Sequence, residues 1–477
     1  MILLFILLIP FLTGLILSLI RNSAIARSIA LGSSLINLII TILLLIQGSD
    51  DGISINWINF LGVRFALGCD GISLLMVLLT NLLFPFIILA GFKRDQRLVP
   101  LLNALILFTQ SALIGVFLAQ NAFLFYIFWE LALIPVYFIL LLWGGKNRNS
   151  ITLKFFIYTL TGSLFLLFGI IYLYQLTPFP HTTDFSAFSL LDIPTGKQIW
   201  LFWILFIAFA IKMPIFPFHT WQPTTYTMAS TQGVMILAGV MTKMGIYGAL
   251  RFLFPVVPAG VQFWQNTVII LSLTGMVYAS VIAFRQTNLK RLIAFSSMAH
   301  ISLISAALFA VNYYAYQGIL LQVVSHGVTI VALFYLVSII EHRAGTPELS
   351  QMGGLKIQAP NLSILFLIVV LGAIGLPLTA GFAGELLMIT GIFRISGWYA
   401  LAGGTTMVLS AIYMLYAYQR VMLGEEKVYL KKITDIALVD YLMLVPLILV
   451  ILGLGIFPQP VFNLVEQSIL IIQNLCR

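Results

Sequence analysis

The sequence predicts an all-α polytopic membrane protein, and three observations lead to this fold class. Of the 477 residues, 61% are hydrophobic and only 8% are charged, whereas soluble domains are about one-quarter charged. Apolar segments of about 20 residues recur along the whole chain, and this is the length of a helix that spans a bilayer. Most of the acidic and basic residues lie between these segments, where loops are expected.

We predict about 14 transmembrane helices from these segments. Their approximate bounds are residues 2–20, 25–46, 71–91, 101–119, 122–143, 153–174, 199–221, 229–253, 265–284, 292–311, 315–340, 361–395, 399–421 and 438–457. We divide the chain into N-terminal helices 1–3 (1–100), a first five-helix repeat (101–253), a second five-helix repeat (254–421), and helix 14 with a tail (422–477).

The basic residues predict the orientation of the chain. The first segment has no basic residue before Arg21, so it lacks the charged start of a cleaved signal peptide. If the N-terminus lies outside, most Lys and Arg residues fall in inward connections such as 93–97, 146–154, 285–291 and 424–435. Because basic residues are enriched in cytoplasmic loops, we expect the N-terminus outside. Arg251 is expected at an outward end.

A small set of ionisable residues falls inside the predicted helices. A carboxylate at mid-membrane costs about 2.5–3.5 kcal/mol on insertion scales, so such residues need a reason. Glu, Lys and His can all exchange protons when burial and neighbouring charges shift them, whereas Arg cannot. The set therefore predicts a proton or ion path, although residues of this kind can also hold helices together as ion pairs. Its members are Glu130, Lys212, His219, Lys243, His300, His326 and Glu385.

Helices 7 and 12 are predicted to be broken. Residues 212–226, "KMPIFPFHTWQPTTY", hold three prolines, and residues 372–385, "GAIGLPLTAGFAGE", hold Pro377 among glycines. Proline removes helical hydrogen bonds, and irregular backbone is tolerated in a membrane only inside protein or beside a wet cavity. Lys212 and Glu385 lie at the edges of these breaks. The breaks are five helices apart, an odd number, so helices 4–8 and 9–13 are predicted to form two inverted repeats.

Several stretches together resemble the antiporter-like membrane subunits of respiratory NADH:quinone oxidoreductase (complex I), in particular the M type. They are "FALGCDGISLLMVLLTNLLFP", "FYIFWELALIPVYFILLLWGG", "FAIKMPIFPFHTWQP", "ILAGVMTKMGIYGALRF", "TNLKRLIAFSSMAHIS", "LLQVVSHGVTIVALFYLV" and "GLPLTAGFAGELLM". The M type is favoured because Glu385 stands where the L and N types and the related Mrp antiporter subunit have lysine. The chain also ends soon after helix 14, without the long lateral helix of the L type.

The resemblance implies a role for each buried residue. Glu130 and Lys212 form the coupling pair of the first half-channel, and Lys243 is the central relay. His300 and His326 continue the path, and Glu385 is its terminal protonatable group. His219 matches the first histidine of a family motif, H-x-W-L-P-x-A-H.

The sequence departs from this motif after Trp221. Gln222 replaces the leucine, Thr224 and Thr225 follow the proline, and Tyr226 stands at the second histidine. A relay role for position 226 is therefore in doubt, and His219 is the weakest of the candidates.

Glu130 lies in "FLFYIFWELALIPVYF", residues 123–138, and its retention suggests a switch. Paired with Lys212, the carboxylate stays ionised and keeps the lysine protonated. When the pair separates, desolvation favours the neutral form of both groups, and Lys212 passes its proton to Lys243. The broken helix supplies a place that can move.

The resemblance implies a subunit of a translocating enzyme with no redox centre and no metal in this chain. No GxGxxG motif after a strand, no phosphate-binding loop and no cysteine cluster is present. NADH, flavin, iron–sulfur clusters and quinone are expected in partner subunits, and L- and N-type subunits are expected as neighbours in a bacterial inner membrane. No nucleic acid is expected as a partner. Two alternatives are an Mrp-type cation/proton antiporter or membrane-bound hydrogenase subunit, and a structural membrane subunit whose charges only join helices.

Overall fold

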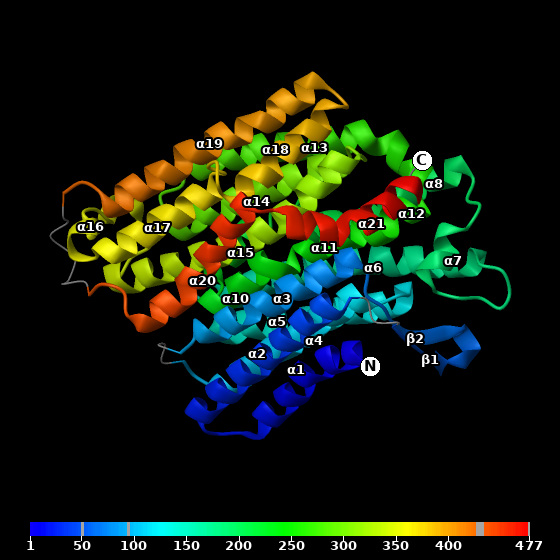
Figure 1. Ribbon diagram of the computed structural model, residues 1–477, viewed down its shortest axis with the longest axis horizontal. Helices are drawn as coiled ribbons and strands as arrows, with labels where there is room; N and C mark the ends of the chain where they lie inside the picture. Colours follow the sequence, from blue (N-terminus) through cyan, green and yellow to red (C-terminus); the bar gives the residue numbers. More distant parts are fainter. Residues whose placement is uncertain (49–51, 93–95, 426–433, 476–477) are drawn as a thin grey trace. The chain divides into compact units, whose positions relative to one another are not determined.

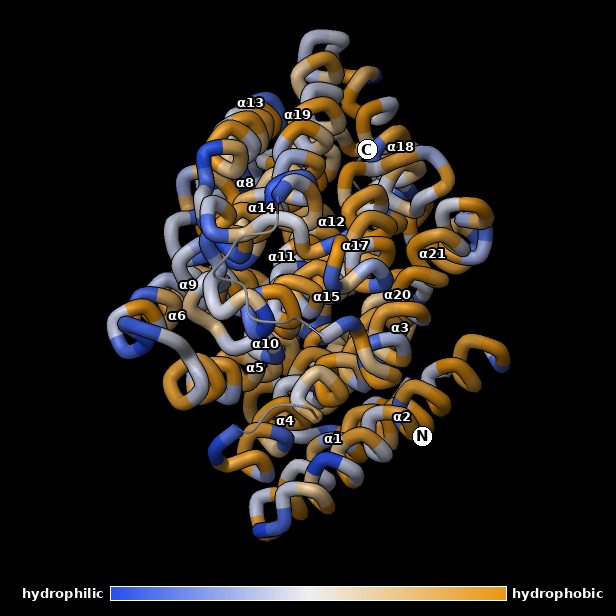
Figure 2. The backbone as a smooth tube through the Cα atoms, turned by 90° about the vertical axis from the view of Figure 1, so that its left-hand side faces the viewer, coloured by the Kyte–Doolittle hydropathy of each residue, from blue (hydrophilic) through white to orange (hydrophobic). Residues whose placement is uncertain are grey.

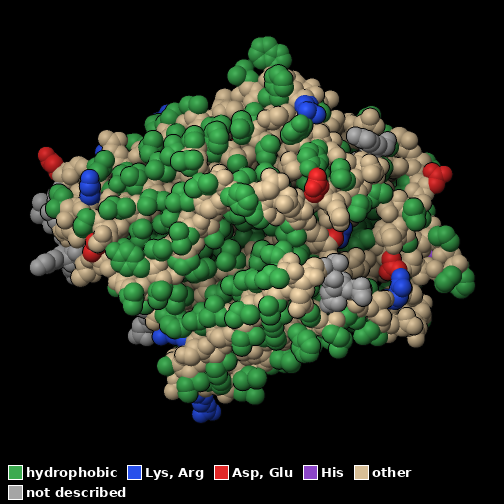
Figure 3. All heavy atoms as spheres, in the orientation of Figure 1, with side chains coloured by type: hydrophobic (Ala, Val, Ile, Leu, Met, Phe, Trp, Pro, Cys, Tyr) green, Lys and Arg blue, Asp and Glu red, His purple; other side chains and the backbone are tan. Residues whose placement is uncertain are grey.

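The computed structural model describes residues 1–48, 52–92, 96–425 and 434–475. Parts of the predicted inward connections 93–97 and 424–435 therefore lie outside the described residues. Within the described residues, thirteen helices are long and apolar enough to cross a membrane. In Figure 2 the helices are hydrophobic along most of their length, and hydrophobic side chains cover most of the face in Figure 3. The predicted fold class, an all-α polytopic membrane protein, is confirmed.

The elements follow the chain as labelled in Figure 1. The first group is α1 (Ile2–Leu19), α2 (Ser23–Gln47), β1 (Ile53–Ile58), β2 (Val63–Leu67), α3 (Gly71–Leu89), α4 (Val99–Leu118), α5 (Ala122–Trp143), α6 (Arg148–Leu176), α7 (Phe185–Ser189), α8 (Thr195–Lys212), α9 (Gln222–Met228), α10 (Thr231–Ile236), α11 (Lys243–Gly248) and α12 (Phe254–Val256). The second is α13 (Pro258–Phe284), α14 (Leu289–Leu308), α15 (Tyr313–Ala344), α16 (Leu355–Gln358), α17 (Pro360–Ala373), α18 (Ala380–Phe393), α19 (Gly397–Met422), α20 (Leu438–Ile456) and α21 (Gln459–Leu475).

The chain forms two compact units. Unit 1 holds Met1–Met213, Val240–Asn266 and Leu464–Arg477, and unit 2 holds Pro214–Gly239 and Thr267–Asn463. The segment Pro214–Gly239 thus leaves unit 1 at the first predicted break and packs with residues that come later in the chain. Within unit 2, Tyr226 from this segment meets the Phe334 ring edge-on at 5.9 Å, and Lys290 Nζ donates to the carbonyl oxygen of Ala229 at 2.5 Å.

Polar side chains join the first helices of unit 1, where α1, α2 and α4 lie side by side (Figure 1). Asn37 Nδ2 on α2 donates to the carbonyl oxygen of Ile6 on α1 at 2.9 Å. Asn81 on α3 donates to Thr41 at 2.7 Å and accepts from Gln110 on α4 at 2.8 Å. Hydrogen bonds between helices stabilise membrane bundles, in which apolar burial gives little preference for helix over lipid.

Small residues allow α15 and α18 to pack closely against each other in unit 2. A Cβ atom added at Gly318 would lie 2.8 Å from the carbonyl oxygen of Gly384, and one at Gly384 would lie 2.6 Å from Gln322 Oε1. The two helices therefore approach closely only because both positions are glycine. This contact brings Gln322 beside the helical turn that carries Glu385.

Both predicted helix breaks are present. Helix α8 ends at Lys212, Pro214 and Pro217 follow, and helix resumes at Gln222. Helix α17 ends at Ala373 and α18 begins at Ala380. Gly375, between them, has a φ of +69°, a conformation in which glycine is strongly favoured. The two inverted repeats and the four-part division of the chain remain proposals.

Among the described residues, a hairpin and a long C-terminal helix were not predicted from the sequence, and neither were the short helices α7 and α16. Residues 53–67, expected as a loop, form an antiparallel hairpin in which Ile53 pairs with Leu67. Residues 459–475, expected as a tail, form helix α21, which buries Val465 and Ile469 and leaves Ile471 exposed. An amphipathic helix of this kind is typical of a membrane surface or of the outside of a bundle.

Candidate functional site

Lys212 ends helix α8 in a buried position at the first break. Its side chain is 4% exposed, and its Nζ lies 5.1 Å from the centre of the Trp129 ring. Trp129 on α5 is held in turn by Ser163, which accepts from its Nε1 at 3.2 Å. Within the described residues, no acceptor binds the lysine nitrogen. The ammonium group therefore rests on an aromatic face, which attracts cations.

Glu130 follows Trp129 and is the acidic side chain that interacts electrostatically with Lys212. The two groups are not in ion-pair or hydrogen-bond contact, and Glu130 Oε1 is buried without a donor among the described residues. The predicted pair is therefore present as neighbours and not as a closed contact.

Lys243 is fully buried at the start of α11. The π-helical segments Leu237–Met241 and Ala249–Leu253 flank α11 on either side, and π-helical turns are frequent at functional sites. A Cβ atom added at Gly245 would lie 2.8 Å from the carbonyl oxygen of Phe209 and 2.6 Å from Met213 Cγ. The helix of Lys243 thus lies directly against the end of α8, which carries Lys212.

A second group of buried residues, in unit 2, surrounds Glu385 beside the second break. Glu385 is fully buried, and its Oε1 lies 3.0 Å from His300 Nδ1, out of line for a hydrogen bond. Gln322 Nε2 donates to the same oxygen at 3.4 Å. A Cβ atom added at Gly375 would lie 3.1 Å from Glu385 Oε2. The carboxyl group therefore fills the space that the break provides.

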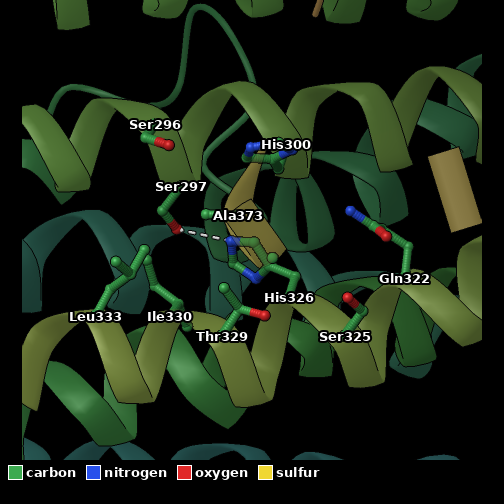
Figure 4. A pocket seen from close by; sticks show the side chains of 11 residues that line it. Ser296, Ser297, His300, Gln322, Ser325, His326, Thr329, Ile330, Leu333 and Ala373 are labelled. Atoms are coloured by element: carbon green, nitrogen blue, oxygen red, sulfur yellow. Dashed lines mark hydrogen bonds between the residues drawn. The ribbon is translucent and has the colours of Figure 1, made fainter. Parts of the chain in front are cut away.

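His300 and His326 belong to the same group and line one small cavity. Their ring centres are 6.1 Å apart, and Ser297 Oγ lies 3.2 Å from His326 Nε2. The cavity measures about 20 Å³, which is enough for about one water molecule. Figure 4 shows His300 and Ser297 on one helix facing His326 and Gln322 on the other. This arrangement places protonatable groups and a water-sized space next to Glu385.

His219 lies among aromatic rings. Its ring is buried and packs against Phe216 at 5.6 Å and Tyr278 at 5.3 Å between ring centres. Tyr226, at the position of the second motif histidine, is also buried and contacts Trp221 and Phe334.

Arg251 lies near the end of the helical stretch Thr231–Val256. Its expected place at an outward end stays a prediction. Arg251 Nη1 forms an ion pair with Asp70 Oδ2 at 2.9 Å. In the sequence, Lys243, Tyr247 and Arg251 are spaced by four residues. This spacing places all three on one helical face.

The fold and these residues define a multi-pass membrane protein with protonatable side chains beside two helix breaks. No group of metal-binding residues occurs in the part of the chain that the structure describes. The chain belongs to the family whose model is described as NADH:quinone oxidoreductase/Mrp antiporter, which matches residues 119–454. This match covers most of the chain and includes every one of the predicted site residues.

Relatives and solved structures agree with this family. The NADH-quinone oxidoreductase subunit M of Rickettsia typhi is 36% identical over 450 residues, which cover 92% of this chain and 90% of that protein. A chain of respiratory complex I from Thermus thermophilus matches with a TM-score of 0.92 and 27% identity, over 100% of both chains. A chain of the Mrp complex from Dietzia has a TM-score of 0.88 at 18% identity, over 100% and 99%, and shares the fold.

Proposed function

We propose that the chain is the M-type proton-translocating membrane subunit of an NADH:quinone oxidoreductase. The observation that carries the proposal is the Glu385 group: a fully buried carboxyl at a helix break, 3.0 Å from His300 and beside a cavity lined by His300 and His326. Buried ionisable residues in membrane helices mark ion and proton paths. The relatives with the name subunit M extend over nearly the whole chain.

Lys212 is the switch of the first half of the path. The end of a helix favours a cation because the last carbonyl groups carry partial negative charge, and Lys212 is in the last turn of α8. Approach of Glu130 keeps Lys212 protonated, and separation favours release of the proton toward Lys243. The contact of α11 with the end of α8 supports this order.

The second half of the path runs through His300 and His326 to Glu385. Each imidazole can accept and donate a proton through its two nitrogen atoms. Glu385 holds a proton as a neutral acid in apolar surroundings and releases it when water or a charged neighbour stabilises the carboxylate. His219 is kept as a weaker candidate because the sequence departs from the family motif after Trp221.

The chemistry of electron transfer belongs to other subunits in this proposal. NADH, flavin, iron–sulfur clusters and quinone are bound there, and this chain contributes translocation only. L- and N-type subunits flank it in a bacterial inner membrane, with its N-terminus outside. Labelling with an impermeant thiol reagent tests the orientation: Leu190→Cys should react in intact cells, whereas Lys146→Cys should not.

Two other functions fit part of the structure. An Mrp-type cation/proton antiporter shares the fold, but the Dietzia chain is only 18% identical. A structural subunit would use the charges as ion pairs, yet Glu130 and Lys212 are not in contact. Copurification with redox subunits separates the first alternative, and pumping by assembled variants separates the second.

The test of the proposal is Lys243→Arg in the assembled complex. Arginine keeps the charge but cannot release a proton, so NADH-driven proton pumping into vesicles should be largely lost. Lys197→Arg, the same change at an exposed lysine, is the matched control and should pump normally. Near-normal pumping by Lys243→Arg at equal amounts of complex contradicts the relay.

A further inference from the structure

A polar cluster that the proposed path does not use lies at the Arg251 end of the Lys243 helix, within unit 1. Arg251 pairs with Asp70 at 2.9 Å, and Asp70 also accepts from Ser468 Oγ at 3.1 Å and from the Ser73 N–H at 2.9 Å. Tyr247 donates to the Phe117 carbonyl oxygen at 2.8 Å, and its hydroxyl lies 2.9 Å from Ser73 Oγ. Arg251 also interacts with the Tyr247 hydroxyl.

This cluster begins at Lys243 and ends at the surface of the unit. Lys243, Tyr247 and Arg251 are spaced by four residues, so they follow one face of the helix and form a polar stripe along it. Lys243 and Tyr247 are fully buried, whereas the side chains of Arg251 and Asp70 are 22% and 29% exposed. Arg251 comes eight residues after Lys243, a rise of about 12 Å along a helix. The stripe is therefore a possible second exit for a proton on Lys243.

Arg251 decides whether that exit is open. Without it, the Tyr247 hydroxyl would lie near a partly exposed carboxylate, which can accept a proton. The guanidinium group instead interacts with both of them. It keeps its charge at all relevant pH values and cannot pass a proton on. Arginine side chains exclude protons from membrane pores in the same way.

We propose that Arg251, which is ion-paired with Asp70, is an electrostatic barrier that prevents proton leak from Lys243 to the surface. The inference rests on the proposed function, since it assumes that Lys243 carries protons. Arg251 acts through the stripe and not on the relay itself, so it is a positioning residue.

A purely structural role explains less of the cluster. Asp70 caps α3 through the Ser73 N–H and is bound by Ser468 without any need of arginine. Tyr247 already has Phe117 and Ser73 as partners. What Arg251 adds to these satisfied groups is a fixed positive charge at the end of the stripe.

The test measures passive proton leak in vesicles that hold the whole complex and no NADH. A potassium diffusion potential drives protons, and a pH-sensitive dye reports their entry. Arg251→Gln should raise the leak rate several-fold over wild type, whereas Asp70→Asn, which keeps the barrier charge, should stay tight. Adding Lys243→Met to Arg251→Gln should return the leak to the wild-type level, because the source of the stripe is gone.

A double variant keeps the test decisive if Arg251→Gln fails to assemble. Asp70→Asn with Arg251→Gln leaves no charge without its partner, which avoids the main cost of breaking a buried pair. This double variant should leak more than Asp70→Asn alone. Equal leak in these two variants, or a leak in Arg251→Gln that persists with Lys243→Met, overturns the inference. Normal pumping by Lys243→Arg instead contradicts the proposed function, so the two failures are distinguishable.

Discussion

The two helix breaks place opposite charges in opposite settings. At the first, Lys212 comes at the end of a helix, rests on the Trp129 ring and has no hydrogen-bond acceptor among the described residues. At the second, Glu385 comes near the start of a helix and is contacted by His300 and Gln322. Each sign matches the partial charge at its helix end. A break in a helix therefore can stabilise a buried cation at the C-terminal end of one half or a buried anion at the N-terminal end of the other.

The partners differ in a way that matters for proton transfer. The Trp129 ring attracts a cation but cannot accept a proton, so it stabilises the charged form of Lys212 without taking part in proton exchange. His300 and the cavity beside it can exchange protons with Glu385 directly. The two breaks thus differ in their neighbours: an aromatic ring at the first, and an imidazole that can exchange protons at the second.

The largest expected effect is at Glu385. Glu385→Gln keeps the shape of the side chain and removes the exchangeable proton, so pumping should fall on the order of 100-fold, the usual contribution of a placed acid or base. Glu385→Asp keeps the chemistry on a shorter stem and should retain part of the activity. ΔpH and quinone reduction are followed together in vesicles. If Gln pumps as well as Asp, Glu385 is only a packing residue.

A smaller loss is expected when the backbone of the second break is altered. Gly375→Ala would place a Cβ atom 3.1 Å from Glu385 Oε2 at a φ of +69°, with a strain of about 1–2 kcal/mol. Pumping should fall about tenfold, as expected for 1.4 kcal/mol. Gly404→Ala on α19 is the control, since a Cβ atom there meets nothing within 4 Å. Equal pumping by both variants would show that the geometry of the break does not position Glu385.

At the first break, the aromatic support of Lys212 can be removed without touching a charge. Trp129→Leu deletes a cation–π contact of about 1 kcal/mol, so pumping should change by about fivefold. Trp129→Phe keeps an aromatic face, loses the hydrogen bond to Ser163, and should change pumping less. Proton uptake at matched quinone turnover is the measurement. A Phe variant as impaired as Leu would assign the effect to packing.

The smallest effect concerns how each broken helix is anchored at its far end. Helix α8 begins after Pro194 without a side-chain cap, whereas the carboxylate of Asp435 accepts from the N–H groups of Asn361 and Leu362 at the start of α17. Burial opposes its ionisation, but these bonds and one from Ile436 lower the pKa of Asp435 overall. Asp435→Ala should lower stability by about 1 kcal/mol and leave pumping intact.

The pH dependence of that loss follows from the direction of the shift. A lowered pKa in the folded state stabilises the protein above the unfolded value of about 3.9 and loses this contribution as the pH falls through the folded pKa. Thermal unfolding of wild type and Asp435→Ala should therefore differ by a constant amount near neutral pH, and the difference should shrink below about pH 4. A difference that is unchanged in acid would contradict this assignment.

The sequence predicted the membrane fold and both breaks because these depend on local chemistry. Apolar segments of spanning length predict membrane helices, and the prolines beside Lys212 predict a break in one of them. The same apolar segments predicted that Glu385, Lys243 and the three histidines inside them are buried.

Features that depend on tertiary contacts were missed. Nothing in the sequence near Arg251 or Asp70 shows that residues so far apart in the chain form an ion pair. The separation of Glu130 from Lys212 depends on side-chain placement against Trp129, which spacing along the chain does not determine. The hairpin at 53–67 is too short and too mixed in composition to stand out beside long apolar helices.

The exchange of the segment Pro214–Gly239 into unit 2 has a consequence for biogenesis. This segment is synthesised before residues 267–463, yet it packs with them, as the contacts of Tyr226 with Phe334 and of Ala229 with Lys290 show. Unit 2 therefore cannot be completed while the ribosome is still making its later helices. Until then, the segment must stay in the translocation machinery or in lipid. A chain truncated before α14 would leave the segment without its native neighbours and would be a ready substrate for membrane proteases.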